Sequence, residues 1–466
     1  MSALTASADS ITTVNPATGE PLQSYMLATA SGIDDALRTA HETFLRWRAT
    51  SLDERAGLLG KLASHFRQNA RDYARTITLE MGKTIVEAEA EVEKCAWACE
   101  YYAEHAHAHL ADDRVETGAL LSYAAYRPLG IVLAIMPWNF PFFQVVRFAV
   151  PALAAGNVAI LKHAANVSGC GLELQRAFLE SGFPRGAFSA IVIRPAQVES
   201  LIADPRVCAV TLTGSEAAGS SVAAMAGKYL KKSVLELGGS DSFIVLADAD
   251  IQTAAKTAVR ARFQNCGQSC IAAKRFIVES DVYDDFCDAF VTGARAIAVG
   301  DPQDRSTTMG PMARADLVDD LRRQVQSSLS MEARLMLGGH RLERPGAFFE
   351  PTILADVRPG MTVFDEETFG PAAAVVRVAS ADEAIDVANA SPYGLGNSVW
   401  SRDVERAESL AERLQSGLVF VNSMTASDPR LPFGGVKRSG YGRELAHFGI
   451  REFTNVQTVS VARSSP

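Results

Sequence analysis

Three residues of this chain could together attack a carbonyl carbon and release the product by hydrolysis. The first is Cys270, which follows a glycine turn in the segment 265–270 (NCGQSC) and precedes an apolar run that could start a helix. Backbone N–H groups at a helix start stabilise a thiolate and the oxyanion that forms when it attacks a carbonyl. Because a cysteine in such a place is more often buried packing, its partners decide between the two interpretations.

Glu236 and Asn139 are the candidate partners, and both stand at the end of an apolar strand. Glu236 lies in the predicted strand 234–237, where a carboxylate is either an ion-paired strand end or a general base. Partial desolvation raises the pKa of such a base and lets it take a proton from water. Asn139 stands in the segment 137–141 (PWNFP). Its amide could donate to an oxyanion or could only stabilise the turn between the prolines.

Two further junctions suit a dinucleotide cofactor. Lys162 ends the apolar strand 158–162, from which an ammonium can reach ribose hydroxyls, and the alternative is a snorkelling lysine. Gly214 and Ser215 follow a strand in the segment 212–215 (LTGS), where backbone amides at a helix start could hold a pyrophosphate. This segment is not the G-x-G-x-x-G fingerprint, so it does not establish a nucleotide site by itself.

The elements that must position these residues alternate between short apolar runs and helical segments from residue 130 onward. The first series of predicted strands spans 131–136, 158–162, 189–193, 209–213 and 234–237. The second series spans 243–246, 275–278, 373–378, 397–400 and 417–421. Helices are predicted between them at 171–180, 217–226, 281–296 and 381–390. This pattern indicates two α/β domains that meet near Gly238 and Gly239, with ligands beyond the carboxyl ends of the strands.

Length and charge restrict the class of protein. A chain of 466 residues with 48% hydrophobic and 21% charged residues is typical of a multidomain globular enzyme. The net charge of −9 is spread without a basic run, which argues against nucleic acid as a partner. Residues 1–20 lack a secretory-signal pattern, and polar residues interrupt the most apolar stretch, 140–161, so no membrane segment is expected. The 7 cysteines show no metal-ligand spacing, and a cytoplasmic protein is expected.

A set of ordered motifs resembles the aldehyde dehydrogenase superfamily. The motifs are PWNFP (137–141), LK (161–162), LTGS (212–215), ELGG (236–239), GQSC (267–270), ETFGP (367–371) and PFGG (432–435). The resemblance covers the chain from about Asn15 to Val459. It implies an α/β fold of two Rossmann-like, doubly wound domains, one for the cofactor and one for catalysis, with a small β oligomerisation element.

The resemblance implies that Cys270 is the nucleophile, Glu236 the general base and Asn139 the oxyanion donor. Cys270 would add to the aldehyde carbon, hydride would pass to a nicotinamide, and water activated by Glu236 would hydrolyse the thioester. This chemistry requires no metal. Two alternatives are a CoA-acylating relative, which typically lacks such a base, and a retired, purely structural family member. The three residues together argue against both.

The cofactor contacts are also carried over from the resemblance. They are expected at Trp138, Lys162, Ala165, Gly214, Ser215, Glu367 and Phe369. Lys162 would hold the adenosine ribose and Ser215 the pyrophosphate. The roles of Glu367 at the nicotinamide ribose and of Phe369 against the nicotinamide rest on the resemblance alone. Ala165 stands where NAD-preferring relatives tend to carry a glutamate, so NAD or NADP is expected.

Within the superfamily, the chain looks closest to compact bacterial succinate-semialdehyde dehydrogenases. The supporting segments are 161–164 (LKHA), 237–241 (LGGSD) and 440–444 (GYGRE). Arg147 falls where related enzymes hold the distal carboxylate, but Gln264 stands where a second arginine is usual. Arg430 could supply that charge or could equally be a solvated loop residue. The expected reaction is oxidation of succinate semialdehyde to succinate, with another short anionic or aliphatic aldehyde as the alternative substrate.

The resemblance further implies subunit assembly. Residues 114–127 are predicted to form a projecting hairpin, and residues 455–461 a strand that could pair with a neighbouring subunit. The expected division is a cofactor domain at 1–112 and 129–238, a catalytic domain at 239–438, and an oligomerisation element at 113–128 and 439–466. We expect a homodimer or homotetramer.

Overall fold

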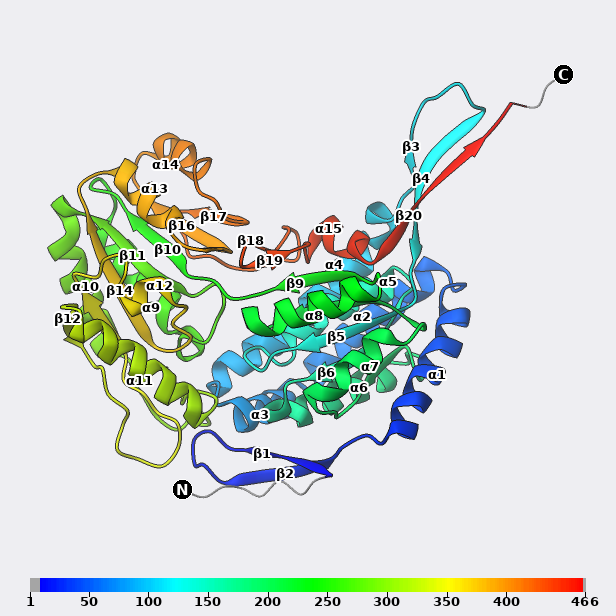
Figure 1. Cartoon of the computed structure of the whole chain (residues 1–466), viewed down its shortest axis with the longest axis horizontal. Helices are drawn as coiled ribbons and strands as arrows, with labels where there is room; N and C mark the ends of the chain where they lie inside the picture. The colour runs from blue at the N-terminus through cyan, green and yellow to red at the C-terminus, as the bar shows by residue number, and fades with distance from the viewer. Residues whose placement is uncertain (1–8, 464–466) are drawn as a thin grey trace.

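Two open α/β sheets carry most of the chain in the computed structural model, which describes residues 9–463 (Figure 1). The first sheet has 6 strands in the order β19-β9-β8-β5-β6-β7, all parallel except β19. Its strands are β5 (Ile131–Met136), β6 (Val158–His163), β7 (Phe188–Ala190), β8 (Val207–Thr213), β9 (Lys232–Glu236) and β19 (Gly440–Tyr441). Buried aliphatic side chains fill both faces of β5 and β6, as a parallel sheet requires.

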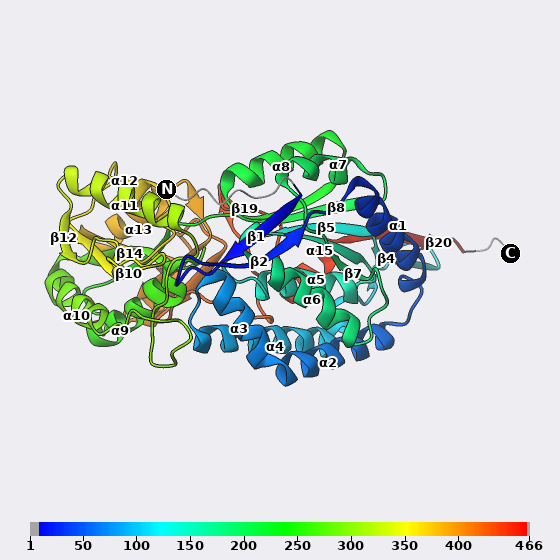
Figure 2. The same cartoon turned by 90° about the horizontal axis from the view of Figure 1, so that it is seen from below.

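Helices surround this sheet and form the larger lobe (Figures 1 and 2). They are α1 (Ala30–Trp47), α2 (Leu52–Gln68), α3 (Ala70–Met81), α4 (Ile85–His109), α5 (Phe143–Ala154), α6 (Ser168–Glu180), α7 (Val198–Ala203) and α8 (Glu216–Lys228). The N-terminal ends of α1, α2 and α4 are capped by Thr29, Ser51 and Thr84, whose hydroxyls accept from backbone N–H groups of the first turn. The hairpin β1 (Ser10–Val14) and β2 (Pro21–Met26) lies across this lobe (Figure 2).

The second sheet has 7 strands in the order β12-β13-β14-β11-β10-β16-β17, parallel except for β12. Its strands are β10 (Asp241–Val245), β11 (Ala273–Glu279), β12 (Arg334–Leu337), β13 (Thr352–Ala355), β14 (Ala372–Val378), β16 (Gly396–Trp400) and β17 (Leu418–Val421). Its helices are α9 (Ile251–Phe263), α10 (Tyr283–Arg295), α11 (Ala315–Ser330), α12 (Thr362–Asp365), α13 (Ala381–Asn389) and α14 (Val404–Ala411). The predicted fold class, α/β with two Rossmann-like domains, is confirmed.

A three-stranded antiparallel arm projects from the larger lobe (Figure 1). It consists of β3 (Asp113–Arg114), β4 (Leu121–Pro128) and β20 (Thr454–Val461), in the order β20-β4-β3. The hairpin and the C-terminal strand were both expected from the sequence. However, β20 pairs with β4 of its own chain along its whole length, from Thr454 opposite Pro128 to Val461 opposite Leu121. Within residues 9–463, the outer edge of β20 pairs with no other strand.

The C-terminal segment connects the two lobes before it reaches the arm. Strand β18 (Val436–Lys437) pairs with β15 (Tyr393–Gly394), β19 joins the first sheet, and α15 (Ala446–Glu452) leads into β20. Within residues 9–463, no helix is both long and apolar enough to cross a bilayer.

Candidate active site

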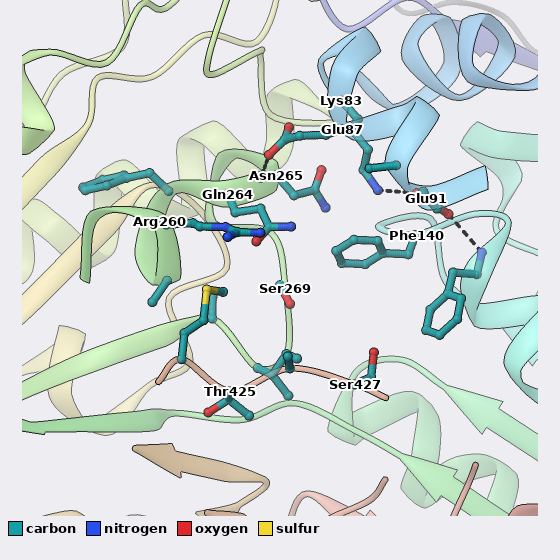
Figure 3. A pocket seen from close by; sticks show the side chains of 18 of the residues that line it. Lys83, Glu87, Glu91, Phe140, Arg260, Gln264, Asn265, Ser269, Thr425 and Ser427 are labelled. Carbon is teal, nitrogen blue, oxygen red and sulfur yellow. Dashed lines mark hydrogen bonds and ion pairs between the residues drawn. The ribbon is translucent and has the colours of Figure 1, made fainter. Parts of the chain in front are cut away.

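A cavity of about 750 Å³ lies between the lobes (Figure 3). Side chains of α4, α5 and α9 line it together with the loop that carries Cys270 and the segment 424–427. Two of the residues predicted to contact substrate, Arg147 and Gln264, line it as well. The cavity therefore brings the predicted nucleophile and two predicted substrate contacts into one space.

The backbone around Cys270 differs from the sequence prediction. The apolar run after Cys270 does not start a helix but leads into β11. Before the cysteine, a 3-10 turn over Gln264–Gly267 holds Asn265 and Cys266 at φ 54°. Left-handed backbone at non-glycine residues is uncommon and clusters at functional sites. A helix N-terminus therefore does not act on the sulfur, and the charges nearby belong to side chains.

The charges around Cys270 act in opposite directions. Burial raises the pKa of the Cys270 thiol to about 12, while the nearby cations Arg147 and Lys274 lower it. The ammonium of Lys274 donates to the carbonyls of Ser269, at 3.0 Å, and Cys270, at 2.6 Å. The thiol is therefore protonated at neutral pH in the free protein, and its cationic neighbours favour the ionised form once the proton leaves.

Asn139 is buried and held against the same loop. Its side-chain Nδ2 donates to the carbonyl of Gln268 at 3.1 Å, and its own carbonyl accepts from Asn265 Nδ2 at 2.8 Å. A side-chain amide has two N–H donors, and only one of them is engaged here. The second has no partner among the hydrogen bonds of the described residues and can donate to a ligand.

Glu236 is a buried carboxylate without a hydrogen-bond partner for either oxygen among the described residues. Burial and the neighbouring carboxylate of Glu444 raise its pKa well above the usual range, while Arg147 lowers it. A side chain at Gly434 would place its Cβ 2.7 Å from Glu236 Oε1, so only glycine fits there. An unpartnered buried carboxyl group of raised pKa is the environment in which a general base works near neutral pH.

Arg147 and Glu444 form a buried ion pair, and both charges act on Glu236. The Arg147 guanidinium also lies over the Phe433 ring, with Cζ 4.4 Å from the ring centroid. Its Nη2 is buried and has no hydrogen-bond partner among residues 9–463. Arg147 can therefore offer a donor to a ligand while it remains paired with Glu444.

Arg430 is not placed in the cavity. Its side chain is 67% exposed and is held by Asp428, with Nε 2.9 Å and Nη2 2.6 Å from the two carboxylate oxygens. Of the two interpretations left open by the sequence, the structure favours the solvated loop residue.

The predicted cofactor residues gather at the carboxyl ends of β6 and β8. Lys162 is the penultimate residue of β6, and its half-buried ammonium has no hydrogen-bond or ion-pair partner in the described part of the chain. Ala165 is exposed at the start of the turn that follows. Gly214 donates to the Glu236 carbonyl at 3.0 Å, and the Ser215 hydroxyl caps α8 by accepting from the Ala218 N–H. This edge leaves an ammonium and a helix start open to a ligand.

The second lobe contributes the other cofactor candidates. Glu367 Oε1 accepts from the backbone N–H of Gly239 at 2.9 Å, so this carboxylate reaches the junction between the two sheets. Phe369 meets Trp138 edge to face, with ring centroids 5.6 Å apart. The buried Arg262 guanidinium donates to the carbonyls of Gly267, at 2.9 Å, and Thr368, at 3.2 Å. This arginine ties the turn before Cys270 to the segment that carries Phe369.

Sequence reasoning missed several residues of this site, namely Glu444, Lys274, Arg262 and Lys94. Glu444 lies in the GYGRE motif, and its charge within a motif was the signal that could have marked it as a candidate contact. Lys94 carried a usable signal, because Glu87, Glu91 and Lys94 recur at helical spacing and all line the cavity. Arg262 and Lys274 gave no signal beyond being charged residues in apolar surroundings.

A fold of two open α/β sheets, with a partly exposed cysteine in the cavity between the lobes and a buried amide and carboxylate nearby, fits a class of enzyme that oxidises aldehydes. The chain belongs to the Aldehyde dehydrogenase family, whose sequence profile matches residues 4–459. The resemblance inferred from the motifs is thereby confirmed.

The relatives include proteins described as succinate-semialdehyde dehydrogenases. The chain is 50% identical over 455 residues to succinate-semialdehyde dehydrogenase NADP(+) 1 of Mycobacterium tuberculosis, covering 97% of this chain and 100% of that one. A solved succinic semialdehyde dehydrogenase of Streptococcus pyogenes, in complex with NADP+, is 38% identical with a TM-score of 0.95, covering 97% of this chain and 100% of that one. A succinate-semialdehyde dehydrogenase structure from Burkholderia pseudomallei is 34% identical with a TM-score of 0.95, covering 97% and 95%.

Proposed function

We propose that this enzyme oxidises succinate semialdehyde to succinate, with NADP or NAD as hydride acceptor. The observation that carries the proposal is the cavity that contains both Cys270 and the unsatisfied guanidinium nitrogen of Arg147. In a short aldehyde that ends in a carboxylate, the aldehyde carbon can react with Cys270 while the carboxylate pairs with Arg147. The names of the relatives support the same substrate.

In the proposed reaction, Cys270 attacks the aldehyde carbon, and its thiol proton passes to water as the carbon–sulfur bond forms. Arg147 and Lys274 stabilise the developing thiolate, and the free N–H of Asn139 stabilises the oxyanion of the thiohemiacetal. The nicotinamide of NADP or NAD supplies, when bound, the acceptor for the hydride. Glu236 then takes a proton from water, whose oxygen attacks the thioester carbon and releases succinate and the Cys270 thiol.

The residues present fit a dinucleotide. A half-buried ammonium without a partner, as at Lys162, needs an acceptor, and ribose hydroxyls provide one. We infer that Ser215 and Gly214 hold the pyrophosphate, while Glu367 and the Trp138–Phe369 pair hold the nicotinamide end. The neutral Ala165 tolerates a 2′-phosphate, in line with the NADP named for the relatives.

The position of the adenosine ribose is tested by Ala165→Glu. A carboxylate that faces the 2′ position repels a phosphate, and like charges ~4 Å apart cost roughly 1–4 kcal/mol between water and protein-surface conditions. The ratio of kcat/KM with NADP to that with NAD should therefore fall by about fivefold or more. Ala165→Gln has the same size without the charge and should leave the ratio nearly unchanged. If the wild-type enzyme, Ala165→Glu and Ala165→Gln all have the same ratio of kcat/KM with NADP to that with NAD, the adenosine ribose does not lie beside Ala165.

The substrate is tested by Arg147→Ala. Loss of a desolvated partner leaves the substrate carboxylate unpaired, at a cost on the order of 2–5 kcal/mol. The kcat/KM for succinate semialdehyde should therefore fall by roughly thirtyfold to several thousandfold, and that for butanal by much less. Steady-state kinetics with both aldehydes measures the difference.

The ion pair with Glu444 calls for a control, because Arg147→Ala also strands a buried carboxylate beside Glu236. The double variant Arg147→Ala/Glu444→Gln removes that charge. If the two aldehydes lose activity alike in both variants, Arg147 is structural and the substrate proposal fails.

Assembly and location form the rest of the proposal. We propose that the free edge of β20 and the arm that it belongs to form the contact between subunits of a dimer or tetramer, and that the enzyme works in the cytoplasm. The free state of all 7 cysteines in the described structure agrees with a reducing compartment. We also propose the domain division 1–112 with 129–238, 239–438, and 113–128 with 439–466.

A further inference from the structure

Lys94 is a cation in the cavity wall that has no carboxylate of its own. It lies on α4, half-buried, and its ammonium donates to the Ser427 hydroxyl at 2.5 Å and lies 4.5 Å from the centroid of the Phe143 ring. Both of these neighbours line the same cavity as Cys270. Figure 3 shows Ser427 at the cavity wall, on the loop that also carries Thr425.

The two carboxylates that act on Lys94 are committed to other groups. Glu91 is ion-paired with Lys83 and accepts from the backbone N–H groups of Phe142 and Phe143 at 2.9 and 3.0 Å. Asp428 is bound by Arg430. No ion pair joins Lys94 to a carboxylate within residues 9–463. Since a desolvated ammonium is unfavourable without an anion, the cavity is prepared for a negatively charged ligand.

Of the other cations that line the cavity, Arg147 and Lys83 are buried in ion pairs, while Lys256 and Arg260 are exposed to solvent. Arg147 is paired with Glu444, and Lys83 with Glu91. Lys94 is therefore the charge that an anionic substrate can neutralise.

We propose that Lys94, with Ser427, binds the distal carboxylate of the aldehyde substrate in the cavity that Cys270 also lines. This assignment rests on the proposed function, because it assumes an anionic substrate. In this assignment, Lys94 on α4 determines the preference for an anionic aldehyde. Arg147 on α5 binds the same carboxylate.

The test is Lys94→Met, which keeps the length of the side chain and removes its charge. The kcat/KM for succinate semialdehyde should fall by roughly thirtyfold or more, chiefly through KM, while that for butanal changes by less than about threefold. Succinate, used as a competitive inhibitor, should bind correspondingly more weakly. Lys94→Arg should keep part of the preference. Lys256→Met is the matched control, because Lys256 also lines the cavity but is exposed, and it should leave both aldehydes nearly unchanged.

The pH dependence gives a second readout. Burial, followed by the charge of Arg147, lowers the pKa of Lys94 to about 8, while Cys95, Glu91 and Asp428 raise it. As pH rises through 8, the free enzyme loses the charge, so KM for succinate semialdehyde should rise while KM for butanal does not follow. Lys94→Met should lack this difference between the two aldehydes.

The outcomes separate this inference from the function on which it rests. If the wild-type enzyme prefers succinate semialdehyde and Lys94→Met keeps that preference and the affinity for succinate, Lys94 is not the anchor, although the function stands. If the wild-type enzyme shows no preference for the anionic aldehyde, the proposed function itself fails. Equal losses for both aldehydes in a folded Lys94→Met enzyme would also overturn the assignment, since they indicate a structural role.

Discussion

Cys270→Ala is expected to reduce aldehyde oxidation on the order of 10⁴-fold or more, because no other group of the cavity can form the covalent intermediate. The residues proposed to hold the adenosine ribose and the pyrophosphate, Lys162 and Ser215, lie at the carboxyl ends of β6 and β8, so dinucleotide affinity should change by less than about threefold. The absorbance of the reduced nicotinamide measures oxidation, and calorimetric titration with NADP measures binding.

Cys266→Ala is the matched control, because Cys266 lies four residues before Cys270 in the same loop but is buried, whereas Cys270 is partly exposed. Burial raises the pKa of the Cys266 thiol beyond the range in which a thiolate forms near neutral pH. The Cys266→Ala variant should therefore keep most of the aldehyde-oxidising activity. Turnover near the wild-type rate in Cys270→Ala, or loss of NADP binding together with activity, would contradict the role proposed for Cys270.

Much of the fold could be predicted because parallel strands buried on both faces give unbroken apolar runs. The predicted strands 131–136 and 373–378 differ from the observed β5 and β14 by at most one residue at an end. Short or exposed strands lack this signal. Strands β19 and β12 were therefore missed, since β19 has 2 residues and β12 is largely exposed.

The candidate site was predictable where a residue follows a strand and not where its partner comes from far along the chain. Glu236 and Asn139 stand at the carboxyl ends of predicted strands of the first sheet, so the topology alone brings them to one edge. Cys270 instead precedes β11 of the second sheet, and its position relative to them depends on how the two lobes pack. The pairing of Arg147 with Glu444 joins residues from α5 and the C-terminal segment, and no local pattern reports it. The helix expected after Cys270 was wrong because the same apolar run satisfies β11, whose seven residues are all buried.

The second large effect is expected from Glu236→Gln. A positioned general base contributes typically 10²–10⁴-fold, so steady-state turnover should fall by about that factor. Acylation and hydride transfer precede the step that needs this base. Stopped-flow mixing should therefore show a burst of about one reduced nicotinamide per active site, followed by slow turnover. Uniform slowing without a burst would mean that Glu236 does not act in deacylation.

The environment of Glu236 predicts how pH acts on the same step. Burial and Glu444 hold its pKa well above the usual range, so the ionised base, and with it the deacylation rate, should increase as pH rises. Glu236→Gln should lose this dependence. Glu444→Gln removes the neighbouring negative charge and leaves the positive charge of Arg147, and both changes favour ionised Glu236. The rising limb of the deacylation profile should therefore move to lower pH in this variant, and a shift to higher pH would show that Glu444 does not act on Glu236 as a charge.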